Sequence, residues 1–429
     1  MMKSTIALAA IAAAAHARGL KSQVEQQFSE YCTKYGKNYT NKAEYNERLQ
    51  NFRDSLNEIA VENAKGHSYT LGLTSYSDWS EDEMSRINGG AATTDMHGEE
   101  LRAMTDQSDN RLTAGRNVSR PNWCEYLPSH YQQLFDECAE EDEDEEPERP
   151  WYCATYEKYD FPLPKECEVA PRPDPRPDPR PEPTPDVKPT PDPKPTPGKH
   201  DPIDWRALGH VTPVKAQGDC GSCSMFSAAA LLETDISIKY DVQVDLSEQQ
   251  IVHCSSPGNN ICASGQVPQR NYEYLNKVKL MSEEDYPYTN SQTRSEVTVC
   301  KDQDQAQKGI AQLKGYEQNS RATVDDLKAQ LAKGAVGIQV QASGWGRNYR
   351  GGIFTSDSCY NRSNHAVTAV GWGIDESTGA DYWIIKNSWG TGWGEDGFMR
   401  LAIDHSRNTG ACNVRELIFW AKDIELVQE

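Results

Sequence analysis

Residues 24–64 carry apolar and charged positions at steps of three and four, which is the spacing of one helix face. Phe28, Tyr31 and Tyr35 begin the pattern. The later positions on this face are Glu44, Arg48, Phe52, Ser55, Ile59 and Asn63. Glu44 and Arg48 stand four residues apart, where opposite charges can pair. The pattern predicts amphipathic helical structure.

A second helix is expected after the glycine-punctuated loop that runs from Gln217 to Cys223. The run 228–232 that follows is alanine and leucine, which favour helices, so Cys223 is predicted to lie at a helix N-terminus. Unpaired N–H groups of a first helical turn stabilise negative charge, which predicts a lowered thiol pKa. The thiolate is the nucleophile of cysteine chemistry.

Two other interpretations of Cys223 stay open at this point. Cys220 and Cys223 form a CxxC, which suits a redox pair or half of a zinc site. A buried structural cysteine is the third possibility.

Elements of two kinds follow along the chain. Ser247 and Gln250 have the spacing of a capping box, which predicts a helix that starts at Ser247. Further on, the apolar runs 366–370, 382–385 and 398–403 are separated by glycine turns and are typical of strands. A helical part therefore precedes a sheet-rich part, and the predicted fold class is α+β.

The N-terminus differs from both patterns. An apolar run of residues 6–15 follows Lys3 and precedes Ala15-His16-Ala17, a small-x-small cleavage site. About ten apolar residues are too few for a membrane anchor, which needs about twenty. Residues 1–17 are predicted to be a secretory signal peptide, which leads to a lysosome-like or digestive compartment or to the exterior. Asn38, Asn117 and Asn361 begin glycosylation sequons.

Charge and cysteine content narrow the picture further. The chain of 429 residues has 65 acidic and 44 basic side chains, a net charge of -21, which argues against nucleic acid or an anionic membrane as partner. Secreted cysteines mostly form disulfides. Seven cysteines follow residue 201, an odd number, so at least one stays unpaired in that part. Nucleophilic catalysis is the leading reason for such a thiol.

The middle of the chain is organised differently from its ends. Residues 91–120 are polar and are predicted to be a linker. Residues 121–167 hold four cysteines, which predicts a small two-disulfide module with three possible connectivities. Within it, the acidic run 140–146 suits a solvated loop or a surface for a basic partner. Residues 168–200 include 13 prolines and are predicted to be an extended linker.

The helical segment near the N-terminus resembles a known inhibitory domain. The spacing from Glu44 through Arg48, Phe52 and Ile59 to Asn63 resembles the propeptide signature of cathepsin-L-like papain-family proteases, with serine at position 55 where the family has asparagine. The stretch from Gly72 to Asp78 resembles a second propeptide motif, with two departures. The resemblance covers residues 24–90. It implies a zymogen in which this segment crosses the active-site cleft in the non-productive direction.

Residues 201–429 resemble the mature enzymes of the same papain family, on the motifs 204–206, 211–215 and 286–288 and on the loop before Cys223. The resemblance implies a papain-like two-lobed fold, with a helical lobe, an antiparallel β-barrel-like lobe and a cleft between them. The helical propeptide precedes these lobes.

The resemblance also implies a catalytic set. His365 lies 142 residues after Cys223, within the roughly 130–150 residues typical of a papain-like histidine. Cys223 would be the nucleophile, His365 its acid and base, and Asn387 the group that orients His365, with Trp389 shielding their hydrogen bond. Gln217 would donate to the oxyanion. The alternatives at these positions are a structural histidine at the start of a strand, a turn asparagine next to a core tryptophan, and a glutamine that belongs to a turn.

Family disulfides carry over as Cys220–Cys262, Cys254–Cys300 and Cys359–Cys412, which leaves Cys223 as the odd thiol. This implied pairing removes the redox and zinc interpretations of the CxxC. No metal or cofactor is expected. The expected partners are protein and peptide substrates and the chain's own propeptide, and we expect a monomer.

Two departures from the family bear on activity. Ser224 replaces the tryptophan that usually follows the nucleophile. A catalytically impaired homologue that acts as a peptide-binding or adhesion module is therefore the alternative function. The implied substrate-binding residues are more polar than usual, which predicts tolerance of polar P2 side chains. They are Gly265, Gln266, Val267, Gln339, Asn364, Leu417 and Trp389.

Overall fold

The computed structural model describes residues 23–88, 201–289, 300, 308–355, 359 and 362–427. The predicted signal peptide, the linker 91–120, the cysteine module 121–167 and the proline-rich linker lie outside the described residues, as do two of the three sequons. In the part of the chain that is described, no helix combines the length and apolarity that a bilayer span requires.

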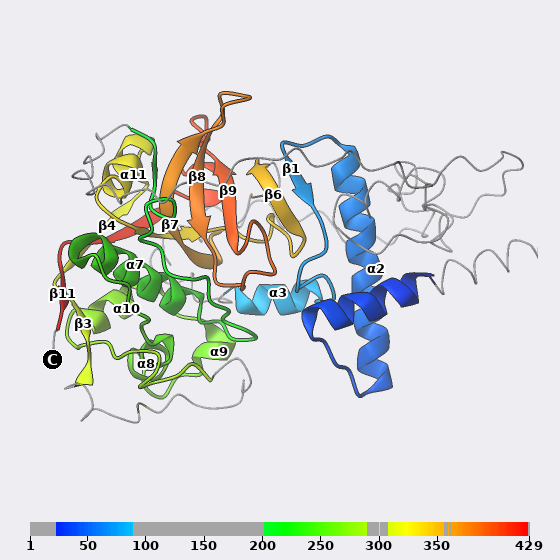
Figure 1. Ribbon diagram of the computed structural model, residues 1–429, viewed down its shortest axis with the longest axis horizontal. Coiled ribbons are helices and arrows are strands. Elements are labelled where there is room, and N and C mark those ends of the chain that lie inside the picture. Colours follow the sequence, from blue (N-terminus) through cyan, green and yellow to red (C-terminus); the bar gives the residue numbers. More distant parts are fainter. Residues whose placement is uncertain are drawn as a thin grey trace, which may run out of the picture. The chain divides into compact units, whose positions relative to one another are not determined.

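The periodic N-terminal stretch forms two crossing helices (Figure 1). The first covers residues 23–35, and the second is α2, Lys42–Ala64, capped by Asn41. Gly36 separates them, with a positive φ of 64° that suits glycine. Phe52 packs on Phe28 and Tyr31 with ring centroids 5.2 and 5.0 Å apart, which gives this segment a small aromatic core.

The motif residues hold this segment together through contacts with residues 71–83. Arg48 forms a bidentate ion pair with Glu83 at 2.6 and 2.7 Å, so the expected pairing with Glu44 is wrong: the guanidinium reaches a different segment. The Asn63 amide exchanges two hydrogen bonds with the Leu71 backbone, at 2.9 and 2.8 Å.

Asp78, the last residue of the second motif, is fully buried. It accepts hydrogen bonds from the Tyr31 and Tyr39 hydroxyls and lies 3.3 Å from the Lys37 ammonium. A buried carboxylate needs such partners, which explains an aspartate at this position.

Helices dominate residues 223–275. They are α7, Cys223–Tyr240, α8, Glu248–Cys254, α9, Ile261–Ser264, and α10, Pro268–Leu275. Most of α7 is buried because it packs on α8, α10 and the strand β7. Ser247 caps α8, accepting from the Gln250 N–H at 3.0 Å. The second half of the predicted capping box is wrong, because the Gln250 amide bonds Tyr274, Lys279 and Met281 instead.

A nine-stranded sheet follows, in the order β1-β6-β9-β8-β7-β5-β10-β4, with β2 paired to β7. Its strands are β1, Tyr69–Leu71, β2, Ile203–Asp204, β4, Tyr316–Ser320, β5, Val336–Val340, β6, Tyr349–Phe354, β7, His365–Ile374, β8, Asp381–Lys386, β9, Phe398–Ala402, and β10, Leu417–Ala421. The runs predicted as strands are therefore β7, β8 and β9. The remaining elements are β3, Ala311–Leu313, paired with β11, Ile424–Leu426, the helix α11, Val324–Leu331, and the 3-10 turn Ala411–Asn413.

The N-terminal segment adds a strand and a helix to this sheet-rich part. β1 pairs antiparallel with β6, with Tyr69 opposite Gly352. The helix α3, Glu81–Ile87, begins at a capping box formed by Ser80 and Glu83. Tyr76, Met84 and Ile87 join the same hydrophobic cluster as the sheet tryptophans.

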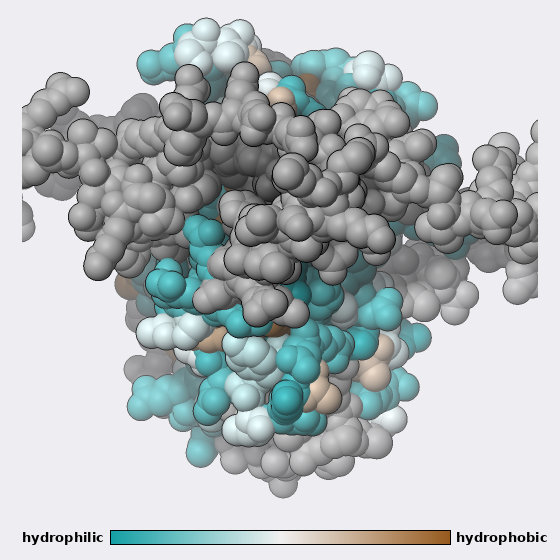
Figure 2. Space-filling view, turned by 90° about the vertical axis from the view of Figure 1, so that its right-hand side faces the viewer, coloured by the Kyte–Doolittle hydropathy of each residue, from teal (hydrophilic) through white to brown (hydrophobic). Residues whose placement is uncertain are grey.

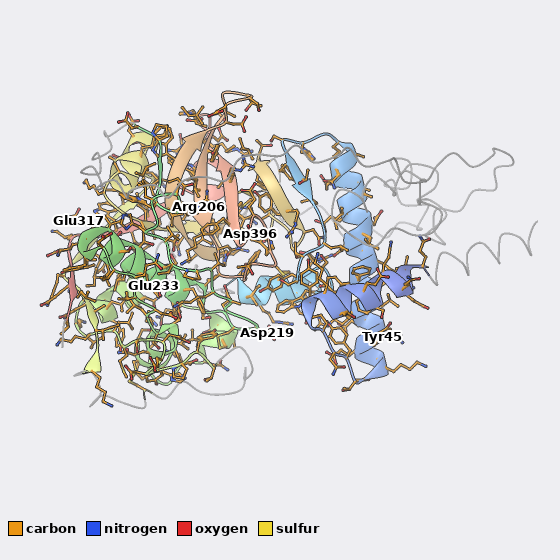
Figure 3. The ribbon with its side chains drawn as sticks, viewed as in Figure 1. Tyr45, Arg206, Asp219, Glu233, Glu317 and Asp396 are labelled. Carbon is orange, nitrogen blue, oxygen red and sulfur yellow. A yellow bond between two sulfur atoms is a disulfide. The ribbon has the colours of Figure 1, made fainter. Side chains whose placement is uncertain are left out.

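The structure contains the three disulfides that the resemblance implies, Cys220–Cys262, Cys254–Cys300 and Cys359–Cys412. Cys32 and Cys223 are free thiols among the described residues. Side chains throughout the described elements are drawn in Figure 3, where Glu233 marks α7. The described residues visible in Figure 2 are mostly hydrophilic.

Candidate active site

Cys223 is the first residue of α7, as predicted. Its side chain is buried, and burial raises the pKa of the thiol to about 11. Backbone hydrogen bonds from Ala366, Ser224 and Cys223 itself act in the opposite direction. The expected lowered pKa is therefore wrong for this state, because the loss of water around the sulfur outweighs the helix terminus.

His365 and Asn387 come together from neighbouring strands. His365 begins β7, Asn387 follows β8, and His365 Nε2 lies 2.9 Å from Asn387 Oδ1. Oδ1 also accepts from the Ser388 N–H at 2.8 Å, which identifies this atom as the amide oxygen. Because an amide oxygen can only accept, Nε2 of His365 must carry the proton. The other ring nitrogen, Nδ1, is left unprotonated and without a hydrogen-bond partner among the described residues.

The surroundings of His365 exclude water. Trp389 stacks at a tilt on the imidazole, with ring centroids 5.0 Å apart, and Trp345 meets its edge at 6.2 Å. Burial lowers the pKa of His365 to about 4, although the hydrogen bond to Asn387 raises it. Thiol and imidazole are thus both neutral near pH 6 in this state. The backbone of Ala366 links the two, since it bonds the Cys223 sulfur and directly follows His365.

Gln217 is fully buried, and its side-chain amide is engaged on both sides. Nε2 donates to the Cys220 carbonyl and to the Ile87 carbonyl, each at 2.8 Å, and Oε1 accepts from the Ser388 hydroxyl at 2.6 Å. Ile87 ends α3 of the N-terminal segment. A backbone carbonyl of that segment therefore occupies the donor that the sequence predicts for an oxyanion.

Tyr288 and Ser222 are parts of this arrangement to which sequence reasoning gave no role. The Tyr288 hydroxyl donates to the Gln217 carbonyl at 2.9 Å and lies 2.7 Å from the Ser222 hydroxyl. Its ring meets Phe226 edge-on at 4.9 Å. The motif 286–288 signalled family resemblance, but its contact with residue 217 spans too much sequence to be read from spacing.

The implied substrate-binding residues fall into two groups. Gly265, Gln266 and Val267 connect α9 to α10, and the Gln266 carbonyl accepts from the Ser224 hydroxyl at 3.0 Å. Gln339 pairs with Ala366 across β5 and β7, while Leu417 begins β10, the other neighbour of β5. Asn364 uses its side chain on the Ala342 N–H and the Ser343 hydroxyl.

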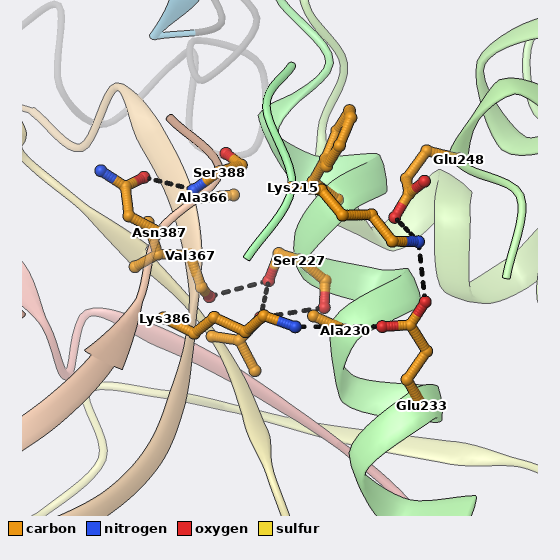
Figure 4. Close-up of a pocket in the computed structure, with 12 residues that line it drawn as sticks. Lys215, Ser227, Ala230, Glu233, Glu248, Ala366, Val367, Lys386, Asn387 and Ser388 are labelled. Carbon is orange, nitrogen blue, oxygen red and sulfur yellow. Dashed lines mark hydrogen bonds and ion pairs between the residues drawn. The ribbon is translucent and has the colours of Figure 1, made fainter. Parts of the chain in front are cut away.

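A buried ion network lies near Asn387, which lines the same pocket as the charged residues. The Lys215 ammonium contacts Glu233 and Glu248 at 2.8 Å each (Figure 4). Lys386 donates a hydrogen bond to Thr212 at 2.8 Å. Burial alone would lower the pKa of Lys215, but the two carboxylates outweigh it and raise that pKa. Burial raises the pKa of Glu248, and the Lys215 ammonium opposes that rise.

A small pocket adjoins this network, between α7 and the strands β7 and β8. It is lined by Ser227, Ala230, Ala366, Val367, Asn387 and Ser388, besides the charged residues. The site therefore rests on a polar interior that joins the helical and sheet-rich parts.

Comparison with known families identifies the chain. Residues 200–421 match the family described as papain family cysteine protease, and residues 28–84 match the cathepsin propeptide inhibitor domain (I29). The first match spans more than half of the chain, which belongs to the papain family of cysteine proteases.

Curated relatives agree with this membership. A cathepsin L-like proteinase of Fasciola hepatica is 39% identical over 222 residues, which cover 51% of this chain and 64% of the relative. Cysteine proteinase 1 of Entamoeba histolytica is 37% identical over 210 residues, covering 47% of this chain and 63% of the relative. The chain thus covers less than two thirds of the length of these relatives.

Solved structures share the fold. A recombinant stem bromelain precursor has a TM-score of 0.61 at 24% identity, covering 93% of this chain and 98% of its own. Digestive procathepsin L 3 of Tenebrio molitor has a TM-score of 0.61 at 23% identity, with the same two shares. The expected papain-like α+β fold with a helical propeptide is therefore confirmed.

Proposed function

We propose that the protein is a cysteine endopeptidase made as a zymogen, with Cys223, His365, Asn387 and Gln217 as its catalytic residues. The observation that carries the proposal is the hydrogen bond between His365 Nε2 and Asn387 Oδ1. It leaves Nδ1 free to exchange a proton with a thiol that begins α7. This arrangement supports nucleophilic acyl transfer.

The reaction follows from these roles. Cys223 gives its proton to His365 Nδ1, and the thiolate attacks the peptide carbonyl. The Gln217 amide and the Cys223 N–H donate to the oxygen that becomes negative. His365 then protonates the leaving amine, and a thioester joins the acyl group to Cys223. Water, deprotonated by His365, hydrolyses the thioester and restores the thiol.

The N-terminal segment silences this chemistry in two ways. The Ile87 carbonyl takes the Gln217 donor, so a substrate carbonyl has no place there. Burial of the two groups in this closed state also favours the neutral thiol and the neutral imidazole, the opposite of the charged pair that attack requires. Removing the segment readmits water and reverses both effects.

Acid is the proposed trigger for removal. Arg48 and Ser80 hold the pKa of Glu83 below its ordinary value in spite of its burial. A carboxylate with a lowered pKa stabilises the folded segment above its ordinary pKa near 4.5, and this stability is lost as the pH falls through the folded pKa. Glu58 acts oppositely, because burial raises its pKa.

The proposal also covers the location, the domain limits and the partners of the protein. A signal peptide at 1–17 would deliver the chain to the secretory pathway, for use in a lysosome-like or digestive compartment or outside the cell, as a monomeric glycoprotein. Domain limits at 24–90, 91–120, 121–167, 168–200 and 201–429 belong to the same proposal. Protein and peptide substrates are its expected partners.

Substrate preference is a separate point. Gln339 and Leu417 lie on neighbouring strands beside Asn364, which supports a polar S2 region. Gln266 contributes less, because its amide donates to Ser255 and Asn271 inside the protein. A peptide library profiled at P2 tests this preference. Strict selection of large apolar side chains would contradict it.

The deciding experiment titrates the acid-activated protein with an irreversible epoxide that alkylates papain-like thiols. Labelling is mapped by mass spectrometry, because Cys32 is a second free thiol within the described residues. We expect stoichiometric labelling at Cys223 and parallel loss of peptidase activity, and neither in Cys223→Ser. Absence of label at Cys223 would overturn the proposal and favour the impaired peptide-binding homologue.

A further inference from the structure

The residue after the nucleophile enters a buried polar chain. Ser224 is 1% exposed, and its hydroxyl donates to the Gln266 carbonyl at 3.0 Å. The same hydroxyl accepts from Asn271 Nδ2 at 2.9 Å. Asn271 is fully buried on α10, and its Oδ1 accepts from the Gln266 amide, which also donates to the Ser255 hydroxyl at 2.7 Å.

This polar chain ties the nucleophile helix to residues 265–267, which we call the wall segment. The segment leaves α9 at Gly265, whose φ of 65° suits glycine. Before the wall segment, the disulfide Cys220–Cys262 and the bond from the Gly221 N–H to the Cys262 carbonyl at 3.0 Å fix the backbone. At Gln266, the middle residue of the wall segment, the backbone carbonyl accepts a hydrogen bond from the Ser224 side chain of α7.

We propose that Ser224 and Asn271 are positioning residues that hold the wall segment for peptide binding, in place of an aromatic side chain after the nucleophile. The inference rests on the proposed function and on the place of residues 265–267 among the substrate-binding residues that the family resemblance implies. A hydroxyl can do this because it satisfies the Gln266 carbonyl and the Asn271 amide at once, and both are shielded from water.

The consequence is a separation between binding and reactivity. The Ser224 side chain does not contact the reacting atoms, because its hydroxyl forms hydrogen bonds with Gln266 and Asn271. Removing the hydroxyl leaves a buried amide donor and a buried carbonyl without their partner, so the wall segment shifts to find another. The shift weakens the binding of peptide ligands, whereas it does not change the reaction rate of a small reagent that needs only the thiol.

The test uses the full chain, activated by acid, as the parent, Ser224→Ala and Asn271→Ala. Thr234→Val is the matched control, because Thr234 is a buried hydroxyl on the same helix that bonds the Ala230 carbonyl at 2.8 Å. Each enzyme is alkylated with iodoacetamide, a small reagent that does not need to bind the wall segment, and with a peptidyl epoxide, which binds it through its peptide part. Steady-state kinetics on a peptide substrate give KM and kcat separately.

For Ser224→Ala and Asn271→Ala we expect the epoxide rate to fall, and KM to rise, by about three- to tenfold. The iodoacetamide rate and kcat should stay at the parent values, as should all constants of Thr234→Val. The double variant should lose less than the two single losses combined, because both residues share one hydrogen bond.

Two results would overturn the inference. Equal falls with both reagents would mean that Ser224 acts on the thiol itself, and unchanged epoxide rates would mean that the wall segment does not depend on it. If Ser224→Ala does not accumulate as folded zymogen, Asn271→Ala decides by the same criteria. Failure of the parent to react with iodoacetamide at Cys223 would instead refute the proposed function.

Discussion

The side-chain amide of Gln217 donates to the backbone carbonyl of Ile87 at 2.8 Å, which joins the proposed oxyanion donor to the last turn of a helix in the inhibitory segment. One side chain thus serves two opposed states. It stabilises the closed zymogen, and after activation it is available to the substrate.

Replacing Gln217 with alanine should therefore weaken both states. Loss of one oxyanion donor typically lowers kcat by about 10²–10³. The variant is converted by a trace of parent enzyme, and kcat is measured on a peptide substrate after active-site titration. Ser388→Ala, which frees Gln217 Oε1 but leaves the amide, should show a smaller loss of the same kind. Parent-like kcat in Gln217→Ala would contradict the role.

Glu83→Gln should shift activation to higher pH. The charged Glu83 stabilises the segment at neutral pH through Arg48, and the amide cannot, so less acid is needed to open the zymogen. Processing is followed by gel electrophoresis across a pH series. Glu62→Gln is the control, because its partners Lys65 and His67 lie on an exposed part of the segment. An identical pH profile for Glu83→Gln and the parent would refute the prediction.

Arg347 connects the peptidase part to the segment by three side-chain contacts. Its guanidinium bonds Ser55 at 2.9 Å and Glu81 at 2.7 Å and lies 3.9 Å from Glu58. Arg347→Ala should raise residual activity of the zymogen at neutral pH, because the buried guanidinium is lost together with its hydrogen bonds to Ser55 and Glu81. A fluorogenic peptide reports the activity. Arg270→Ala, an exposed arginine on α10, should leave it unchanged.

Lys215→Met should destabilise the zymogen by about 3–5 kcal/mol, because Glu233 and Glu248 would remain buried without their ammonium partner. Urea unfolding monitored by tryptophan fluorescence measures the change. Lys239→Met removes an exposed ion pair between α7, the helix that carries Glu233, and Asp423, and should cost less than about 1 kcal/mol. Comparable losses in the two variants would show that burial of the network is unimportant.

Local patterns predicted the elements that carry the chemistry. Composition after a glycine loop located the start of α7 at Cys223, and apolar runs between glycines located β7, β8 and β9. These features depend on residues within a few positions of one another, so they can be predicted from the local sequence.

Long-range contacts account for what sequence did not predict. Arg48 pairs with Glu83 rather than with its neighbour Glu44, and Tyr288 reaches back to Gln217. The raised pKa of the Cys223 thiol has the same origin, because its burial depends on residues distant in the chain. Ser224 was recognised as unusual, but its partners on α10 follow only from the packed structure.

Because β1 pairs with β6, activation should depend on the concentration of the cleaved segment as well as on cleavage itself. Tyr69 and Thr70 lie opposite Gly352 and Gly351, so main-chain hydrogen bonds, indifferent to side-chain identity, hold this part of the segment. Cutting the chain turns an intramolecular contact into an encounter between two molecules, whose frequency falls with dilution. At high concentration a freed segment would re-dock on β6, the strand it had left, whereas dilution would disperse it and leave the peptidase open.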